Sequence, residues 1–255
     1  MRVTHFSKLL QGNNGIRISD DLILFNDFEL YSLKTDKSKQ YNSLEDLLEN
    51  EPEVKEIIEK APYFALKYGG GRGQLSKTMG GGFNHARTNA GKNGGEEMQN
   101  AVLNYGTAGG NSIQAVLGRF REKYGDADRE YGAAVDELGY VHKLKKGGST
   151  AVSIHGNKGE TIIHNHPGGG NFSDLDLINT ATTQERGIVA TGSNVKNPVT
   201  YHFKKNQNFK AKEFVKAVRN AKWPDNLSYD KGADWWLKKN QRAYGYKYSS
   251  KGIID

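Results

Sequence analysis

The residues of this chain best suited to chemistry are two histidines, His164 and His166, followed ten residues later by Asp176. Side chains two positions apart on a strand leave from the same face, so both imidazoles of a strand ending here point one way. Two imidazoles and one carboxylate suit a first-row metal, most often zinc, and leave a fourth tetrahedral position open for water. This ligand set is typical of a catalytic zinc site, which lowers the pKa of its water toward ~7.

The residues between the histidines and the aspartate predict how the chain turns back to bring Asp176 toward the histidines. Pro167 ends the strand, and the glycines at 168–170 let the backbone turn sharply. Ser173 is placed as the N-cap of a helix, which puts Asp176 in that helix's first turn. We therefore expect a strand, a glycine turn and a helix start that bring the aspartate back toward both histidines.

A hydrolytic metal site also needs a proton acceptor near the water, and Glu130 is the best candidate. Glu130 directly precedes a predicted strand, and pairing of that strand can bring it beside the histidines. Two other carboxylates compete with it. Glu137 lies in a predicted hairpin turn, and Glu160 opens the histidine strand, too far along it to share the end where His164 lies.

The predicted elements around these residues mix strands and helices, which indicates an α+β or α/β protein. We expect helices over 43–60, 112–124, 173–184, 211–222 and 233–244. We expect strands over 22–25, 28–33, 131–135, 140–144, 151–155, 161–164, 188–191 and 199–203.

Composition divides the chain into four regions. Residues 1–68 form a small N-terminal α+β region, and 69–111 form a Gly-rich basic linker or arm, because ten of the 27 residues at 69–95 are glycine. Residues 112–205 contain the metal-site pattern, and 206–255 form a helical C-terminal extension.

An upstream Glu, then His-x-His-Pro, then Ser-x-x-Asp resembles the signature of the JAB/MPN metalloproteases, also called JAMM. Glu130-Tyr-Gly and the Asp136-Glu-Leu-Gly-Tyr-Val sequence resemble JAB-like domains of phage and mobile-element proteins and of polymorphic toxins. The resemblance covers roughly 112–205. It differs in one respect, because six residues separate His166 from Ser173 where the family pattern has seven, a difference that glycine-rich sequence can absorb.

The resemblance implies a JAB-like, cytidine-deaminase-like mixed sheet with flanking helices. It implies that His164, His166 and Asp176 bind Zn²⁺, that Glu130 is the general acid/base, and that Ser173 stabilises the oxyanion. The implied activity is zinc-dependent hydrolysis of a peptide or isopeptide bond by a phage- or mobile-element-encoded protein.

Two alternatives remain open. The first is a virion or head-associated structural phage protein, in contact with capsid or portal proteins, that keeps the fold without turnover. The second is a toxin domain that shares the same site.

The composition excludes other kinds of site. The 255 residues contain no cysteine, which excludes disulfides, Cys-ligated zinc, iron–sulfur clusters and a cysteine nucleophile. A net charge of +7 favours acidic partners, with nucleic acid contacts expected through the basic linker and the lysines and tyrosines of the C-terminus. No stretch reaches ~18 apolar residues and no secretory signal begins the chain, so we expect no membrane contact. Together with the phage setting that the resemblance implies, this gives an expected location in the bacterial host cytoplasm or the phage virion.

Overall fold

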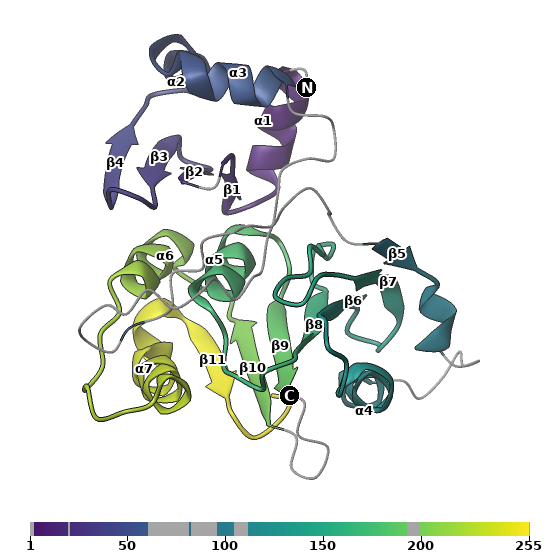
Figure 1. Cartoon of the computed structure of the whole chain (residues 1–255). Helices are drawn as coiled ribbons and strands as arrows, with labels where there is room; N and C mark the ends of the chain where they lie inside the picture. The colour runs from purple at the N-terminus through teal and green to yellow at the C-terminus, as the bar shows by residue number, and fades with distance from the viewer. Residues whose placement is uncertain are drawn as a thin grey trace.

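The computed structural model describes residues 3–19, 21–60, 82, 96–104, 112–192 and 199–254. Within these residues two β-sheets combine with α-helices, which confirms the expected mixed α+β class (Figure 1). None of the helices in this part of the chain is long and apolar enough to cross a membrane.

The larger sheet has seven strands in the order β11-β10-β9-β8-β6-β7-β5. Neighbouring strands are antiparallel except β8 and β9, which are parallel. The strands are β5 (Glu96–Met98), β6 (Tyr131–Val135), β7 (Val141–Lys146), β8 (Thr161–His166), β9 (Gly187–Gly192), β10 (Thr200–Lys205) and β11 (Tyr246–Ser249).

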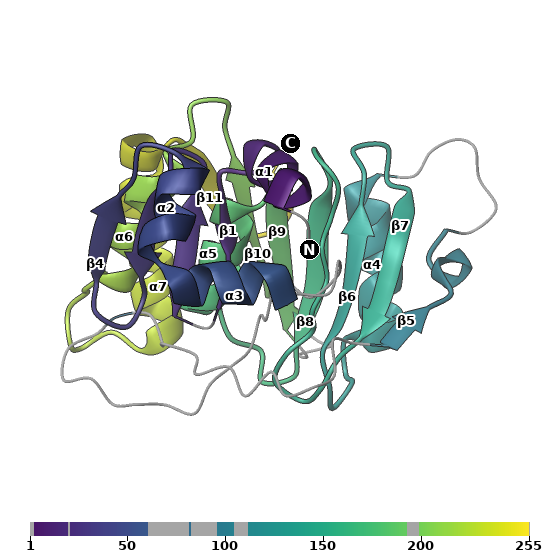
Figure 2. The ribbon, with the colours of Figure 1, turned by 90° about the horizontal axis from the view of Figure 1, so that it is seen from above.

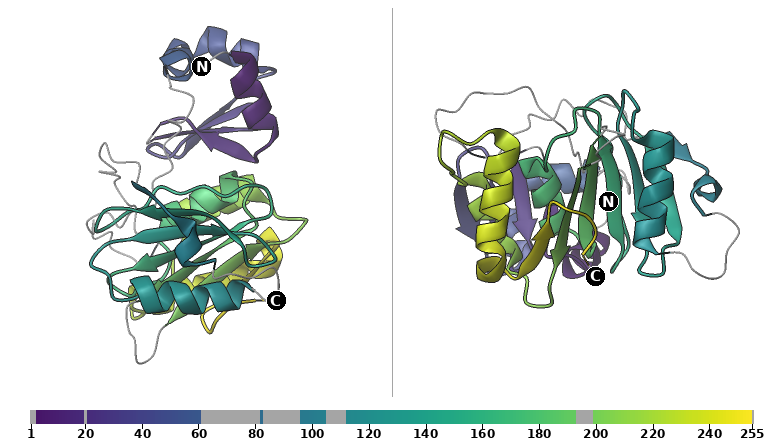
Figure 3. Two further views of the ribbon diagram at one scale, coloured as in Figure 1. Left: turned by 90° about the vertical axis from the view of Figure 1, so that its right-hand side faces the viewer. Right: turned by 90° about the horizontal axis from the view of Figure 1, so that it is seen from below.

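Both faces of this sheet are covered at its centre, so every residue of β8 and β9 is buried. On one face Ile162 and Ile188 pack in a cluster with α5, α6 and α7. On the other face Ile163 and Val189 pack with α4, which Figure 3 shows from below. The helices are α4 (Ile113–Tyr124), α5 (Asp174–Thr182), α6 (Ala211–Arg219) and α7 (Tyr229–Tyr244).

The N-terminal region contains a four-stranded antiparallel sheet and three helices. It lies over α5 and α6 and leaves β6 and β7 uncovered (Figure 2). Apolar side chains of this sheet, among them Phe25 and Tyr31, join the same core cluster as α5 and α6. The elements are α1 (Val3–Gln11), β1 (Gly15–Arg17), β2 (Leu22–Phe25), β3 (Glu29–Ser32), β4 (Lys37–Gln40), α2 (Leu44–Asn50) and α3 (Pro52–Lys60).

The strand predicted over 151–155 is wrong, because these residues form no strand. Strand β6 already pairs with β7 on one side and β8 on the other, which leaves no free edge for a further strand there. Residues 151–155 instead cross the face of the sheet. A Cβ built on Gly132 in β6 would lie 2.8 Å from Ile154 Cγ2 and 3.2 Å from Val152 Cγ1.

The C-terminal extension adds a strand to its two helices. Strand β11 pairs with β10 at the edge of the sheet and buries Tyr246 and Tyr248. These two rings, expected among the tyrosines available to nucleic acid, are therefore part of the core. Of the two adjacent tryptophans in α7, Trp236 is buried and Trp235 is partly exposed.

Most of the expected linker, 69–81, 83–95 and 105–111, lies outside the described residues. Within its range, β5 pairs antiparallel with β7, and Asn100 of the 3₁₀ helix η1 (Asn100–Val102) donates a hydrogen bond to Val141 O at 2.8 Å. This part of the range thus extends the edge of the large sheet.

Candidate metal centre

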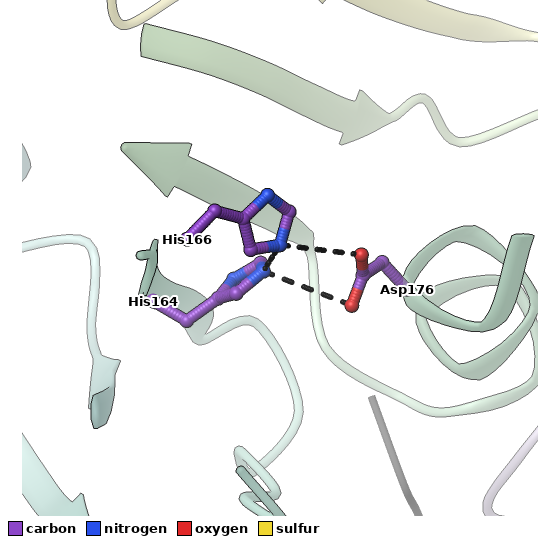
Figure 4. Close-up of side chains that lie close together, drawn as sticks. All are labelled: His164, His166 and Asp176. Carbon is purple, nitrogen blue, oxygen red and sulfur yellow. Dashed lines mark hydrogen bonds and ion pairs between the residues drawn. The ribbon is translucent and has the colours of Figure 1, made fainter. Parts of the chain in front are cut away.

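His164, His166 and Asp176 lie together in the interior of the protein (Figure 4). The two Nε2 atoms of the histidines are 2.8 Å apart. His164 Nε2 lies 3.7 Å from Asp176 Oδ1, and His166 Nε2 lies 3.6 Å from Asp176 Oδ2. The structure therefore brings together the three residues that the sequence predicts as metal ligands, and all three are buried.

The glycine turn after β8 returns the chain over a short distance. Gly169 adopts a φ of 67°, in the left-handed region that glycine favours, and its N–H donates to His166 O at 2.8 Å. The loop ends at Ser173, where α5 begins. Six residues between His166 and Ser173 are thus enough to place Asp176 against both histidines.

The start of α5 holds the Asp176 side chain in place through a capping box. Asp176 Oδ2 accepts hydrogen bonds from both the N–H and the hydroxyl of Ser173, each at 2.8 Å. The Ser173 hydroxyl in turn accepts from Asp176 N at 3.2 Å. Ser173 therefore serves as the helix cap and orients the carboxylate, and its hydroxyl proton is directed at Asp176.

Hydrogen bonds also fix the orientation of the His166 ring. Its Nδ1 lies 2.8 Å from Gly170 O and therefore acts as a donor, because a carbonyl oxygen only accepts. This leaves Nε2 as the atom available to a metal, an arrangement that metal-binding histidines commonly show. The His164 Nδ1 atom is buried and has no hydrogen-bond partner that meets normal geometry among the described residues, although the Val189 backbone lies beside the ring and favours its protonated form.

The short distance between the two Nε2 atoms requires one proton between them. We assign this proton to His166. Burial and the charge of His166 lower the pKa of His164 to about 4. Burial also acts against a charged His166, but contact with the Asp176 carboxylate and the charge of Glu130 raise its pKa to about 9. Burial disfavours the Asp176 carboxylate, yet the two histidines hold the pKa of this group well below its usual range.

The donor set fits a zinc ion after a small adjustment. Two ligand atoms bound to zinc at about 2.1 Å with tetrahedral angles lie about 3.4 Å apart. The two nitrogen–oxygen distances are close to this value, whereas the two histidine nitrogens, now 2.8 Å apart, must separate by about 0.6 Å to reach it. An ion held by these residues would take the place of the shared proton, and the Asp176 carboxylate would provide negative charge.

Glu130 lies in the same cavity as His164 and Asp176. Strand β6 pairs with β8 so that Gly132 lies opposite His164, and continuing this antiparallel register by two residues places Glu130 opposite His166. The side chain of Glu130 is buried, and its charge acts on His166. The pairing of two strands therefore brings the predicted general base to the predicted ligands.

The two competing carboxylates lie elsewhere. Glu137 stays in the hairpin turn and forms an ion pair with Arg186 at 3.6 Å. Glu160 accepts hydrogen bonds from the backbone and the side chain of Asn157, at 2.7 and 2.8 Å. Neither lines the cavity that contains the histidines.

Asn165, between the two histidines, is a positioning residue that sequence reasoning missed. Its Oδ1 accepts from Tyr131 N at 2.6 Å, and its Nδ2 donates to Arg129 O at 2.9 Å. These are the backbone groups on either side of Glu130. The alternation of the strand shows that Asn165 faces away from the histidines, but its partners depend on the register with β6.

The loop before α5 is fastened by the C-terminal region, which sequence reasoning also missed. Asn171 N donates to Asp230 Oδ1 at 2.7 Å, and Asn171 Nδ2 donates to the Tyr248 hydroxyl at 2.9 Å. The Tyr229 hydroxyl donates to Phe172 O at 2.7 Å. Helix α7 and strand β11 thus support the loop that carries Gly170 and Ser173.

The cavity at the site is small, about 40 Å³. About 10–15 Å³ of such space is enough to hold one water molecule, so the cavity has room for a few water molecules. Its lining combines the polar groups of the site with apolar side chains from β8, β9 and residues 151–155. The lining residues are Glu130, Val152, Ile154, His155, Ile162, His164, Asp176, Asn179, Thr180, Thr183, Glu185 and Ile188.

Comparison with protein-family models, curated proteins and solved structures finds no match to this chain. The account of the site therefore depends on its residues and geometry.

Proposed function

We propose that this protein is a zinc-dependent hydrolase that cleaves a peptide or isopeptide bond. The observation that carries the proposal is the buried group of His164, His166 and Asp176, with ligand atoms all within 4.8 Å of one another. Glu130 in the same cavity supports a hydrolytic role, because a structural zinc site has four protein ligands and needs no nearby base. The resemblance to JAB/MPN metalloproteases, and with it a JAB-like fold, forms part of this proposal.

Each residue has a role in the proposed reaction. Bound zinc polarises a carbonyl group and lowers the pKa of a water ligand toward ~7. Glu130 accepts the proton of the attacking water and delivers it to the leaving nitrogen. Asp176 and His166 remain oriented by Ser173 and Gly170.

The Ser173 hydroxyl now donates its hydrogen bond to Asp176. It can stabilise the oxyanion only if it donates to the oxyanion in place of Asp176. Ser173 is therefore a secondary contributor in this proposal, and a zinc ion held by His164, His166 and Asp176 would supply most of the stabilisation of negative charge on the carbonyl oxygen.

One observation favours the alternative, a virion or head-associated structural protein that keeps the metal site without turnover. His164, His166 and Asp176 are only 2%, 5% and 5% exposed, so a peptide does not reach them in this conformation. A structural role requires no access for substrate, whereas hydrolysis requires that part of the cavity wall moves.

Metal loading followed by peptide cleavage separates the two roles. The full chain is supplied with Zn²⁺ and incubated with a mixed library of unstructured peptides, and new termini are identified by mass spectrometry. The hydrolase predicts cleavage that stops with a chelator and in Glu130→Gln, and that returns when zinc is restored to the wild type. Bound zinc without any cleavage would favour the structural role.

A further inference from the structure

The segment 149–156, named here the strap, forms one wall of the cavity of the candidate metal centre. Val152 and Ile154 of the strap line the cavity together with His164 and Asp176. Both apolar side chains are buried and belong to the core cluster that includes α5. The strap is thus a wall of the cavity, and it is a stretch of chain without helix or strand.

Backbone hydrogen bonds hold the first end of the strap. Gly148 N donates to Ala151 O at 2.8 Å, and Gly148 O accepts from Glu130 N at 2.7 Å. Gly147 N donates to Glu130 O at 2.8 Å. This end is therefore joined to the residue that the proposed function uses as the base.

Side chains hold the other end. Glu185 Oε1 accepts a hydrogen bond from Gly156 N at 2.9 Å, and Lys143 Nζ donates to His155 O at 3.1 Å. Glu185 lies between α5 and β9, is 3% exposed, and lines the cavity. Its second oxygen, Oε2, is buried and has no hydrogen-bond partner among the residues that the structure describes.

A buried carboxylate is costly unless its hydrogen bonds compensate, and burial raises the pKa of Glu185 to about 7. Among the charged side chains, Lys205 lowers the pKa of Glu185 the most. Its ammonium group donates hydrogen bonds to Thr180 O and Thr183 O at 2.6 and 2.7 Å. Glu185 therefore contacts the strap through the hydrogen bond from Gly156 N, and its Oε1 also lies 3.9 Å from Nδ1 of His155 in the strap.

We propose that Glu185 is a positioning residue that latches the strap over the metal centre, so that breaking its bond to Gly156 opens the route to the metal. The inference rests on the proposed function, because it describes access to the same site. Opening frees one strap end while the backbone hydrogen bonds near Glu130 remain.

If Glu185 latches the strap, breaking its bond to Gly156 changes the rates of zinc binding and release without changing the zinc affinity. This hydrogen bond joins two buried groups, so its loss raises the population of open strap about tenfold. Zinc then enters and leaves faster by the same factor, and its equilibrium affinity stays within about threefold. A residue that supported the ligands directly would instead alter the affinity.

The experiment compares the wild type with Glu185→Ala and Glu185→Gln in the full chain. Gln keeps an oxygen acceptor for Gly156 N and is the matched control, and Glu137→Ala removes an exposed carboxylate elsewhere. Zinc loading and zinc transfer to a chromogenic chelator are timed, and affinity is measured by competition with the same chelator. Amide hydrogen exchange of the strap is measured on the metal-free proteins.

We expect Glu185→Ala to exchange zinc about tenfold faster in both directions, with faster amide exchange in the strap, and the two controls to stay close to the wild type. Unchanged zinc rates, or a lower affinity without faster loading, would overturn the latch. If no variant binds zinc, the proposed function fails, and amide exchange alone decides whether Glu185 latches the strap. Lys143→Met, which removes the neighbouring contact, replaces Glu185→Ala if that variant does not fold.

Discussion

The side chain of Asn165 holds the backbone on both sides of Glu130, because it accepts from Tyr131 N and donates to Arg129 O. Asn165 itself lies between the two histidines of the candidate centre. One strand thus provides two metal ligands from one face and the support of the proposed base from the residue between them. Because the ligands and the support of Glu130 are different side chains, substitutions can test metal binding and proton transfer separately.

Replacing Glu130 by Gln keeps the size of the side chain and removes its basicity. We expect Glu130→Gln to bind zinc as the wild type does, because Glu130 is not among the three ligands. We expect peptide cleavage to fall at least about a hundredfold, the lower range for loss of a general base. Glu137→Gln, in the exposed hairpin turn, is the control and keeps full activity. Equal cleavage by Glu130→Gln and the wild type would remove Glu130 from the reaction.

Asn165→Ala tests the support of Glu130. The substitution leaves Arg129 O and Tyr131 N without their side-chain partner, which costs about 2–4 kcal/mol in the free energy of unfolding. Urea unfolding in the presence of a chelator measures the loss. Asn240→Ala, which removes a single hydrogen bond to Trp236 O on α7, is the control and changes stability less. A loss no greater than that of the control would show that the bridge to β6 is unimportant.

Substitution of Asp230 tests whether helix α7 supports the loop that carries Gly170. Asp230→Ala removes the acceptor for Asn171 N, so the loop no longer fixes the His166 ring, and we expect zinc affinity to fall about tenfold. Asp230→Asn keeps an oxygen acceptor and is expected to bind zinc nearly as the wild type does. Competition with a chelator measures both affinities, and identical behaviour of Asp230→Ala and Asp230→Asn would contradict this role of α7.

Stability is expected to fall with acidification because of His202 in β10. Burial, followed by the charges of Lys204 and Arg186, lowers the pKa of His202 to about 4 in the folded protein, whereas an unfolded histidine titrates near ~6.5. Between these values the unfolded chain binds more protons, so stability is complete above pH ~6.5 and decreases as pH falls toward ~4. The folded and unfolded pKa values differ by about 2.5, which corresponds to ~3 kcal/mol.

His202→Asn isolates this contribution, because other buried histidines remain in both proteins. Asn can still accept the hydrogen bond that Ile254 N donates to His202 Nδ1 at 2.8 Å. Urea unfolding at pH 7.5 and pH 5, with a chelator present, should show a smaller loss of stability in His202→Asn than in the wild type. An equal loss in the two proteins would exclude His202 as a source of the pH dependence.

The candidate ligands could be predicted from the sequence because local signals place all three. Strand alternation sets the common face of His164 and His166, and the glycine turn and the Ser173 cap return Asp176 within one short segment. Each of these signals extends over only a few residues, so no knowledge of the rest of the fold was needed.

Contacts between distant segments could not be predicted in the same way. The bridge from Asn165 to Tyr131 joins positions 34 apart and depends on strand register, and the bond from Asn171 to Asp230 joins positions 59 apart. The wrong strand over 151–155 has a related cause. Alternating Val152 and Ile154 indicate one buried face, but burial against the face of a sheet produces the same pattern as pairing within it.

The most direct test of the account is the zinc content of the purified full chain, measured by mass spectrometry for the wild type, His164→Ala and Asp176→Ala. His142→Ala, a partly exposed histidine outside the centre, is the control. The account predicts about one zinc per chain in the wild type and in His142→Ala, and loss of zinc in the two ligand variants. No zinc in the wild type after supply at neutral pH, or zinc retained in both ligand variants, would contradict it.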